Sequence, residues 1–193
     1  MKVYDLTPRR LNLGCGRNPI DGFVNLDRQN LPGVDVVHDL EQFPLPFYDD
    51  TFDEILGVDL IEHVSNALGL MEELWRIAKP GALCTFILPY GSSDDAWEDP
   101  THVRPYFVGS WRYFAQPIYY RADYGYRGDW ECAELILEVS DTSQSPDELM
   151  QDIQFMRNIV LRQEAHLVCQ KPARPADPSM LSTPRVLFRK FGG

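Results

Sequence analysis

The sequence predicts an α/β fold built on an open, mostly parallel sheet, and three features of its first half predict it. Strand-like segments follow one another at residues 10–13, 23–27, 34–38, 54–60 and 82–90. A glycine turn follows the first segment, and apolar residues at helical spacing separate the last two. Strands that alternate with turns or helices in this way are typical of parallel sheets.

The first strand and its turn predict a ligand-binding edge. Gly14 and Gly16 allow a sharp turn and let backbone N–H groups approach a ligand. Asp27 ends the second strand, where a carboxylate can accept hydrogen bonds from ribose hydroxyls. A dinucleotide site would need a third glycine where Pro19 stands and an acid about 20 residues further on. An adenosine-bearing ligand without phosphates therefore fits better, and the alternative is a glycine turn that only joins core strands.

Four segments resemble motifs of class I S-adenosylmethionine-dependent methyltransferases. Residues 11–16, Leu-Asn-Leu-Gly-Cys-Gly, are similar to the first motif of that family, hydrophobic-x-L-G-C-G. Residues 47–55, 59–64 and 73–81 are similar to three later motifs, and they follow in the family's order. The resemblance covers residues 11–90. It implies a Rossmann-like, doubly wound, mostly parallel sheet of about seven strands with an antiparallel C-terminal strand.

The resemblance also implies S-adenosylmethionine as cofactor and S-adenosylhomocysteine as product. Asp39 and Leu40 would contact the adenine ring, although Asp39 alone could be a turn residue. The segment from Asp59 to Val64 would line the pocket beside the methyl donor, where Glu62 and His63 shape the pocket and direct chemistry at His63 is the alternative. The cofactor-binding residues that we expect are Gly14, Cys15, Gly16, Asp27, Asp39, Leu40, Asp59 and His63.

The next helix and the following strand are defined by local signals. Ser65 is expected to cap a helix with apolar positions at Leu68, Met71 and Leu74. Residues 79–81, Lys-Pro-Gly, are expected to end it before the fifth strand.

Residues 91–128 are rich in aromatic and charged side chains and too long for an ordinary connection. They leave the fifth strand at its carboxyl end, so we interpret them as an acceptor-binding lid, with a surface loop as the alternative. His102 is the candidate catalytic base because it titrates near neutral pH, unless it only bonds to Asp99. Trp97, Arg104 and Tyr106 are candidate acceptor-binding residues, although Trp97 and Tyr106 could be core of the lid.

The C-terminal part predicts a strand at 130–140, a helix from Ser145 and a last strand at 163–171. We therefore expect a methyltransferase-like domain over residues 1–171 and a Pro-rich tail over 172–193.

The links that join the first three strands are too short for helical crossovers, which need a dozen or more residues. The helices on one sheet face are therefore expected to be absent or shortened. The segment 91–128, the tail, or a second subunit in a homodimer would cover that apolar face.

The composition of the chain limits the classes of partner that we expect. The chain of 193 residues suits one domain, and 18 basic against 29 acidic residues give a net charge of −11. Because nucleic-acid binding depends on Lys and Arg, a nucleic-acid partner is unlikely on this charge. Apolar runs are too short for a membrane span or a signal peptide, so we expect a cytoplasmic protein. Cys15, Cys84, Cys132 and Cys169 have no C-x-x-C or histidine spacing, so we expect buried thiols and no metal site.

The predicted function is methyl transfer to oxygen or nitrogen of a small-molecule acceptor by in-line displacement, with the protein positioning the reactants and supplying a base. The alternative is an adenosylmethionine-binding subunit that is regulatory or otherwise non-catalytic. A small NAD-dependent dehydrogenase is disfavoured by Pro19 and by the early position of Asp27.

Overall fold

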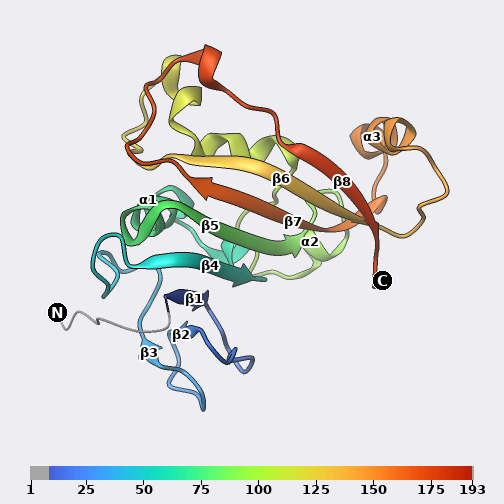
Figure 1. Cartoon of the computed structure of the whole chain (residues 1–193). Helices are drawn as coiled ribbons and strands as arrows, with labels where there is room; N and C mark the ends of the chain where they lie inside the picture. The colour runs from blue at the N-terminus through green and yellow to red at the C-terminus, as the bar shows by residue number, and fades with distance from the viewer. Residues whose placement is uncertain (1–8, 193) are drawn as a thin grey trace.

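The computed structural model, which describes residues 9–192, contains one eight-stranded sheet in the order β3-β2-β1-β4-β5-β7-β6-β8 (Figure 1). Residues 1–8 of the expected domain and Gly193 of the expected tail lie outside the described residues. The strands are β1 Arg10–Leu13, β2 Val24–Asp27, β3 Val36–Val37, β4 Phe52–Val58, β5 Ala78–Pro89, β6 Trp130–Val139, β7 Val160–Cys169 and β8 Arg185–Lys190.

The direction of the strands confirms the predicted fold class. Strands β1 to β5 pair in parallel, and β7 lies antiparallel between β5 and β6. The eighth strand, β8, was not predicted and adds to the far edge of the sheet, where it runs parallel to β6.

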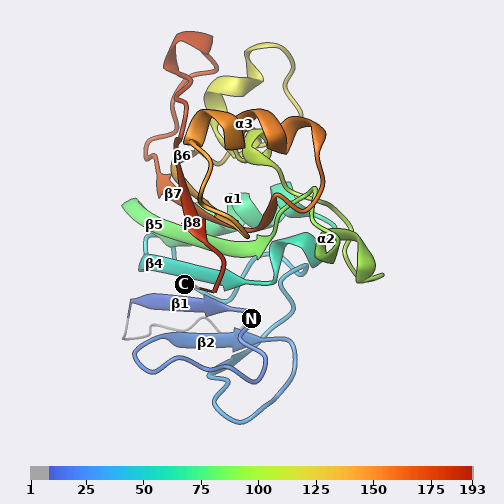
Figure 2. The same cartoon turned by 90° about the vertical axis from the view of Figure 1, so that its right-hand side faces the viewer.

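The longer helices lie on a single side of the sheet. In Figure 2, α1 and α3 both lie to the right of β6, β7 and β8. The α-helices are α1 Ala67–Ile77, α2 Asp95–Glu98 and α3 Pro146–Phe155, and the 3-10 turns are η1 Ile61–His63, η2 Val108–Phe114, η3 Gln116–Tyr120 and η4 Pro178–Met180. Among residues 9–192, none of these helices belongs to the links after β1 and β2, which confirms that these connections lack helices. In the described part of the chain, no helix is both long and apolar enough to cross a membrane.

A pair of amides replaces the helix that would otherwise follow β1. The Asn12 amide donates to Asn25 Oδ1 at 2.9 Å, and the Ile20 N–H donates to the same oxygen at 2.8 Å. These bonds fasten the link to β1 and β2 and satisfy polar groups of two buried side chains. The link therefore needs no helix to hold its shape.

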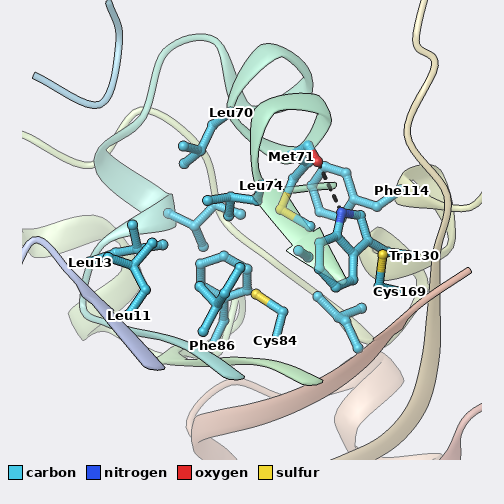
Figure 3. Packing of buried hydrophobic residues seen from close by; sticks show 14 of the residues in the cluster. Leu11, Leu13, Leu70, Met71, Leu74, Cys84, Phe86, Phe114, Trp130 and Cys169 are labelled. Atoms are coloured by element: carbon cyan, nitrogen blue, oxygen red, sulfur yellow. Dashed lines mark hydrogen bonds between the residues drawn. The ribbon is translucent and has the colours of Figure 1, made fainter. Parts of the chain in front are cut away.

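The main core lies between the sheet and α1. Figure 3 shows Leu70 and Leu74 of α1 above Leu11 and Phe86 of the sheet. The indole of Trp130 belongs to the same cluster and donates to the Met71 carbonyl at 2.9 Å. Burial of such an apolar face stabilises the fold by about 25 cal/mol per Å².

Residues 91–128 cover the same face as α1. The ring of Trp111 in η2 stacks on Phe86 and also on Tyr106, and its indole N–H donates to the buried side chain of Gln163. This segment therefore does not cover the other face of the sheet. Of the three candidates for covering that face, the tail and a second subunit remain.

On β6, β7 and β8, that other face carries charged side chains on neighbouring strands, whereas on β5 it presents Leu83, which is 37% exposed. His166 on β7 lies 3.6 Å from Glu134 on β6 and 2.7 Å from Glu164, and Arg189 on β8 contacts Glu164 at 2.9 Å. Cross-strand pairs of opposite charge suit a face that meets water. Whether a second subunit covers it stays a prediction.

Several element boundaries differ from the sequence-based expectation by a few residues, and hydrogen bonds explain two of these differences. Asn66, not Ser65, caps α1, because its side chain accepts from the Gly69 N–H at 3.0 Å while the Ser65 N–H donates to Glu41. The fifth strand starts at Ala78, directly after the helix. Its early start is stabilised by Lys171, whose ammonium group donates to the carbonyls of Arg76 and Ala78.

The Pro-rich tail is anchored at both ends. Arg174 forms an ion pair at 2.9 Å with Asp129, whose side chain is 0% exposed, and β8 then pairs with β6. A buried carboxylate that keeps no cationic partner is costly, so Arg174 links the tail to the stability of the whole sheet.

We predict that Arg174→Ala lowers the free energy of unfolding by about 3–5 kcal/mol, because it leaves the Asp129 carboxylate buried without a cationic partner. Arg185→Ala is the matched control. Its side chain is 73% exposed and lies 3.6 Å from Glu134, so its loss should cost less than about 1 kcal/mol. Urea denaturation measures both values, and equal effects would contradict the anchoring role.

Candidate active site

The strand register gathers the predicted site segments at one edge of the sheet. Leu13 of β1 is aligned with Leu26 of β2 and Gly57 of β4, and Leu26 is aligned with Val36 of β3. The segments that follow these four parallel strands therefore begin side by side. Ligands of open parallel sheets bind at this carboxyl edge.

The glycine turn after β1 has the backbone that its sequence predicts. Gly14 and Gly16 have φ of 58° and 54°, in the left-handed region that favours glycine. A Cβ on Gly14 would lie 2.6 Å from a methyl group of Leu60, so this turn also packs closely against the segment after β4. The Cys15 N–H donates to the Leu26 carbonyl at 3.0 Å.

Asp27 closes this turn. Its Oδ2 accepts from the Gly16 N–H at 2.8 Å, and its Oδ1 accepts from the Gln29 N–H at 2.8 Å. Each carboxylate oxygen can accept about two hydrogen bonds, so Asp27 keeps capacity for a ligand hydroxyl. Asp39 caps its own turn through the Glu41 N–H at 3.0 Å, and Leu40 is buried in the core.

The segment after β4 carries a buried carboxylate. Glu62 on η1 is 3% exposed, and both of its side-chain oxygens lack a hydrogen-bond partner. Burial, which disfavours the charged form, raises the pKa of Glu62 to about 7. Nearby, Asp59 is in the left-handed region and forms an ion pair with Arg162 of β7 at 2.7 Å.

Two histidines from distant segments meet beside Glu62. The rings of His63 and His102 lie edge to face with centroids 4.6 Å apart. The Val103 N–H donates to the Glu62 carbonyl at 2.8 Å, and this bond holds the segment that carries His102 over η1. The backbone N–H of His102 donates to the Asp99 carbonyl at 3.2 Å, as the alternative for His102 expected, but its Nε2 lies 3.9 Å from Asp99 Oδ2, too far for a side-chain hydrogen bond.

Hydrogen bonds define the tautomer of both rings. His102 Nδ1 faces the Ala96 carbonyl at 3.1 Å, so Nδ1 carries the proton. The Thr101 hydroxyl donates to Asp99 and is therefore the acceptor for His63 Nδ1 at 3.0 Å. In the neutral form, both rings present an unprotonated Nε2.

These groups border a cavity of about 340 Å³. Five carboxylates line it, and they are Asp59, Glu62, Asp95, Glu98 and Asp99. The only guanidinium among its lining residues is that of Arg162, which is already paired with Asp59. The cavity is therefore strongly acidic and favours neutral or cationic occupants.

The three expected acceptor-binding residues are not gathered at this cavity. Trp97 is 62% exposed, and its indole donates to the Gly91 carbonyl at 2.9 Å. Arg104 and Tyr106 both border a separate cavity of about 360 Å³, beside Leu68 and Tyr119. The side chain of Tyr106 is 1% exposed and stacks on Trp111, so it also belongs to the core, which agrees with the alternative for this residue.

Sequence reasoning missed two features of this site. Glu62 was expected only to shape the pocket, and its burial without a partner depends on residues 101–103 folding over it. Arg162 was not identified, because it lies 103 residues from Asp59 and no local pattern connects the two.

Comparisons with known proteins agree with this architecture. Residues 11–86 match a family model described as a methyltransferase domain. A structure of an S-adenosylmethionine-dependent methyltransferase from Archaeoglobus fulgidus is 16% identical, with a TM-score of 0.56 over 86% of this chain and 88% of that one. A second, from Mesorhizobium loti, is 14% identical, with a TM-score of 0.52 over 83% of this chain and 90% of that one.

The same fold also occurs with another chemistry. The [4+2]-cyclase SpnF is 14% identical, with a TM-score of 0.54 over 84% of this chain and 74% of that one. Identities this low show the fold alone. A search of curated proteins found no match.

We predict that Glu62→Gln stabilises the metal-free protein at neutral pH. The pKa of Glu62 rises from 4.5 to about 7 on folding, so the folded state holds a proton that the unfolded state releases between these values. The free energy of unfolding of the wild type therefore falls as pH rises through this window, by about 3 kcal/mol in all.

Chemical denaturation in the presence of a chelator, repeated between pH 5 and pH 8, measures this difference. The advantage of the Gln variant should be small at the acidic end and largest at pH 8. Glu98→Gln, at an exposed position of the same cavity, should show no such trend. A stability difference between Glu62→Gln and the wild type that stays constant at all pH values would contradict the raised pKa of Glu62.

Proposed function

We propose that the chain is a class I S-adenosylmethionine-dependent methyltransferase and that it methylates oxygen or nitrogen of a small-molecule acceptor; the match of residues 11–86 to a methyltransferase domain and the fold support this proposal. The observation that carries this proposal is the acidic cavity of about 340 Å³ beside the segment after β4.

The residues at the carboxyl edge fit the adenosyl group. The glycine turn offers backbone without side chains, since a Cβ on Gly16 would meet nothing closer than 4.0 Å. Asp27 retains acceptor capacity for ribose hydroxyls, and Asp39 stands at the end of the neighbouring strand. We propose that the adenosine binds there, with its sulfonium end near Asp59 and His63.

The cavity supports a small acceptor that is neutral or cationic. Asp59 is paired with Arg162, but Asp95, Glu98 and Asp99 also line the cavity and would repel an anion. Arg104, the residue expected to bind an anion, borders a different cavity. The net charge of −11 likewise disfavours a nucleic-acid acceptor.

The reaction needs positioning and removal of one proton. The acceptor atom attacks the methyl carbon in line with the departing sulfur, the carbon–sulfur bond breaks, and its electron pair stays on sulfur to give a neutral thioether. A hydroxyl acceptor also gives up its proton. His102 Nε2 carries the lone pair that can take this proton, because the Ala96 carbonyl holds the other proton at Nδ1.

The cellular setting that we propose is a reducing compartment such as the cytoplasm. All four cysteines are buried free thiols, and burial raises the pKa of Cys132 and Cys169 to about 12. Such thiols are packing residues with little reactivity.

Methyl transfer from labelled S-adenosylmethionine to a pool of small metabolites tests the function. We expect label in at least one compound, and we expect His102→Ala to lower the rate by about 100-fold or more, the usual size of a general-base contribution. His166→Ala, on the opposite sheet face, should leave the rate unchanged. Cofactor binding without any transfer would instead support a regulatory subunit, and a loss within about threefold for His102→Ala would remove its role.

Asp27→Asn tests the cofactor position. The amide can still accept from the Gly16 N–H but loses the charge that strengthens bonds to ribose hydroxyls, so we expect affinity for S-adenosylhomocysteine to fall about 10- to 100-fold. Asp21→Asn, at an exposed position in the same link, is the control. Equal calorimetric affinities for the two variants would place the adenosine elsewhere.

A further inference from the structure

The carboxylate of Glu62 is buried without a partner that could balance its charge. Its side chain is 3% exposed, and neither carboxylate oxygen accepts a hydrogen bond. Buried carboxylates are normally hydrogen-bonded, paired with a cation or bound to a metal ion. Arg162, the guanidinium of this cavity, is paired with Asp59 instead. The carboxylate therefore lacks a protein partner and borders the acidic cavity.

The two histidines beside it are arranged as metal ligands usually are. A ligating histidine commonly donates its second ring N–H to a carbonyl or another oxygen, which fixes the tautomer and orients the ring. His102 does so through the Ala96 carbonyl, and His63 does so through Thr101, which is itself held by Asp99. These hydrogen bonds use Nδ1 of each ring, so the Nε2 lone pair of each ring stays available for a metal ion.

The three donors lie close together. One donor atom from each of Glu62, His63 and His102 can be chosen so that all lie within 4.8 Å of one another. Two atoms that bind one zinc ion at about 2.0–2.2 Å in tetrahedral geometry lie about 3.3–3.6 Å apart. Side-chain rotation that closes the group by up to about 1.5 Å is enough to reach such distances.

We propose that Glu62, His63 and His102 bind a divalent first-row transition-metal ion. Imidazole nitrogen suits ions such as zinc, iron and cobalt, and one carboxylate with two histidines leaves further coordination positions open. The surrounding carboxylates of Asp59, Asp95 and Glu98 add favourable charge for a cation.

The site has no signal in local sequence spacing. The expectation of no metal site depended on the spacing of the cysteines, whereas this site contains no cysteine. Its two histidines lie 39 residues apart and meet only because residues 101–103 fold over η1.

The role of the ion, which rests on the proposed methyl transfer, would be to activate the acceptor hydroxyl. A bound ion would act as a Lewis acid and would lower the pKa of an acceptor hydroxyl beside it. His102 Nε2 would then hold the ion, and the ion would take over the role that the proposed function gives to His102 as base.

Cobalt binding to the full chain tests the site directly. The protein is stripped with a chelator, the chelator is removed, and Co²⁺ is titrated while the visible absorption is followed. Metal content after dialysis against Zn²⁺ gives the stoichiometry. We expect one ion per chain, with affinity lowered at least about tenfold in both Glu62→Gln and His102→Ala.

His166→Ala is the matched control, because His166 lies between Glu134 and Glu164 on the opposite face. It should bind Co²⁺ as the wild type does. Retained binding of S-adenosylhomocysteine shows that each variant is folded. The proposal is overturned if the wild type binds no Co²⁺, or if Glu62→Gln and His102→Ala bind it as tightly as the wild type.

Failure of this proposal is distinct from failure of the proposed function. Cofactor binding and methyl transfer without any Co²⁺ binding would reject the metal site alone. Co²⁺ binding that depends on Glu62 and His102, in a protein that transfers no methyl group, would support the site and reject its proposed use.

Discussion

The parallel register of β1 with β2 and β4 is the constraint on which the functional edge depends. Leu13 aligned with Leu26 and with Gly57 brings the glycine turn, Asp27 and the segment of Glu62 to the same edge. The bond from the Gly16 N–H to Asp27 then ties two of these segments together. A slip of one residue in either pairing would move side chains to the opposite face and separate these groups.

The segment that covers one face of the sheet also builds part of the candidate site. Short links after β1 and β2 leave no room for helices, and their polar groups are satisfied by the Asn12 and Asn25 amides instead. The segment 91–128 packs its Trp111 into the covered face and, at its beginning, carries His102 over η1. One insertion therefore supplies both core packing and the side chain that we propose to be functional. Its backbone also encloses Glu62, so the packing that stabilises the fold creates the buried carboxylate.

The sequence could predict the sheet and its glycine turn because their signals are local. The motif at residues 11–16, the left-handed glycines and the short links are all contained in a few neighbouring residues, and the structure confirms the fold they predict. The tail strand β8 could not be predicted, since its pairing with β6 joins segments about 50 residues apart. The burial of Tyr106 and the Asp59–Arg162 pair depend in the same way on distant contacts. The Asn66 cap was missed for a different reason, because Ser65 beside it has an equally good capping side chain.

The most direct test of this account is a crystal structure of the protein with S-adenosylhomocysteine and Zn²⁺. The account predicts adenosine against residues 14–16 with ribose hydroxyls on Asp27, and the sulfur directed toward the cavity that Glu62, His63 and His102 border. Adenosine bound away from the glycine turn, or a sulfur directed away from that cavity, would contradict it.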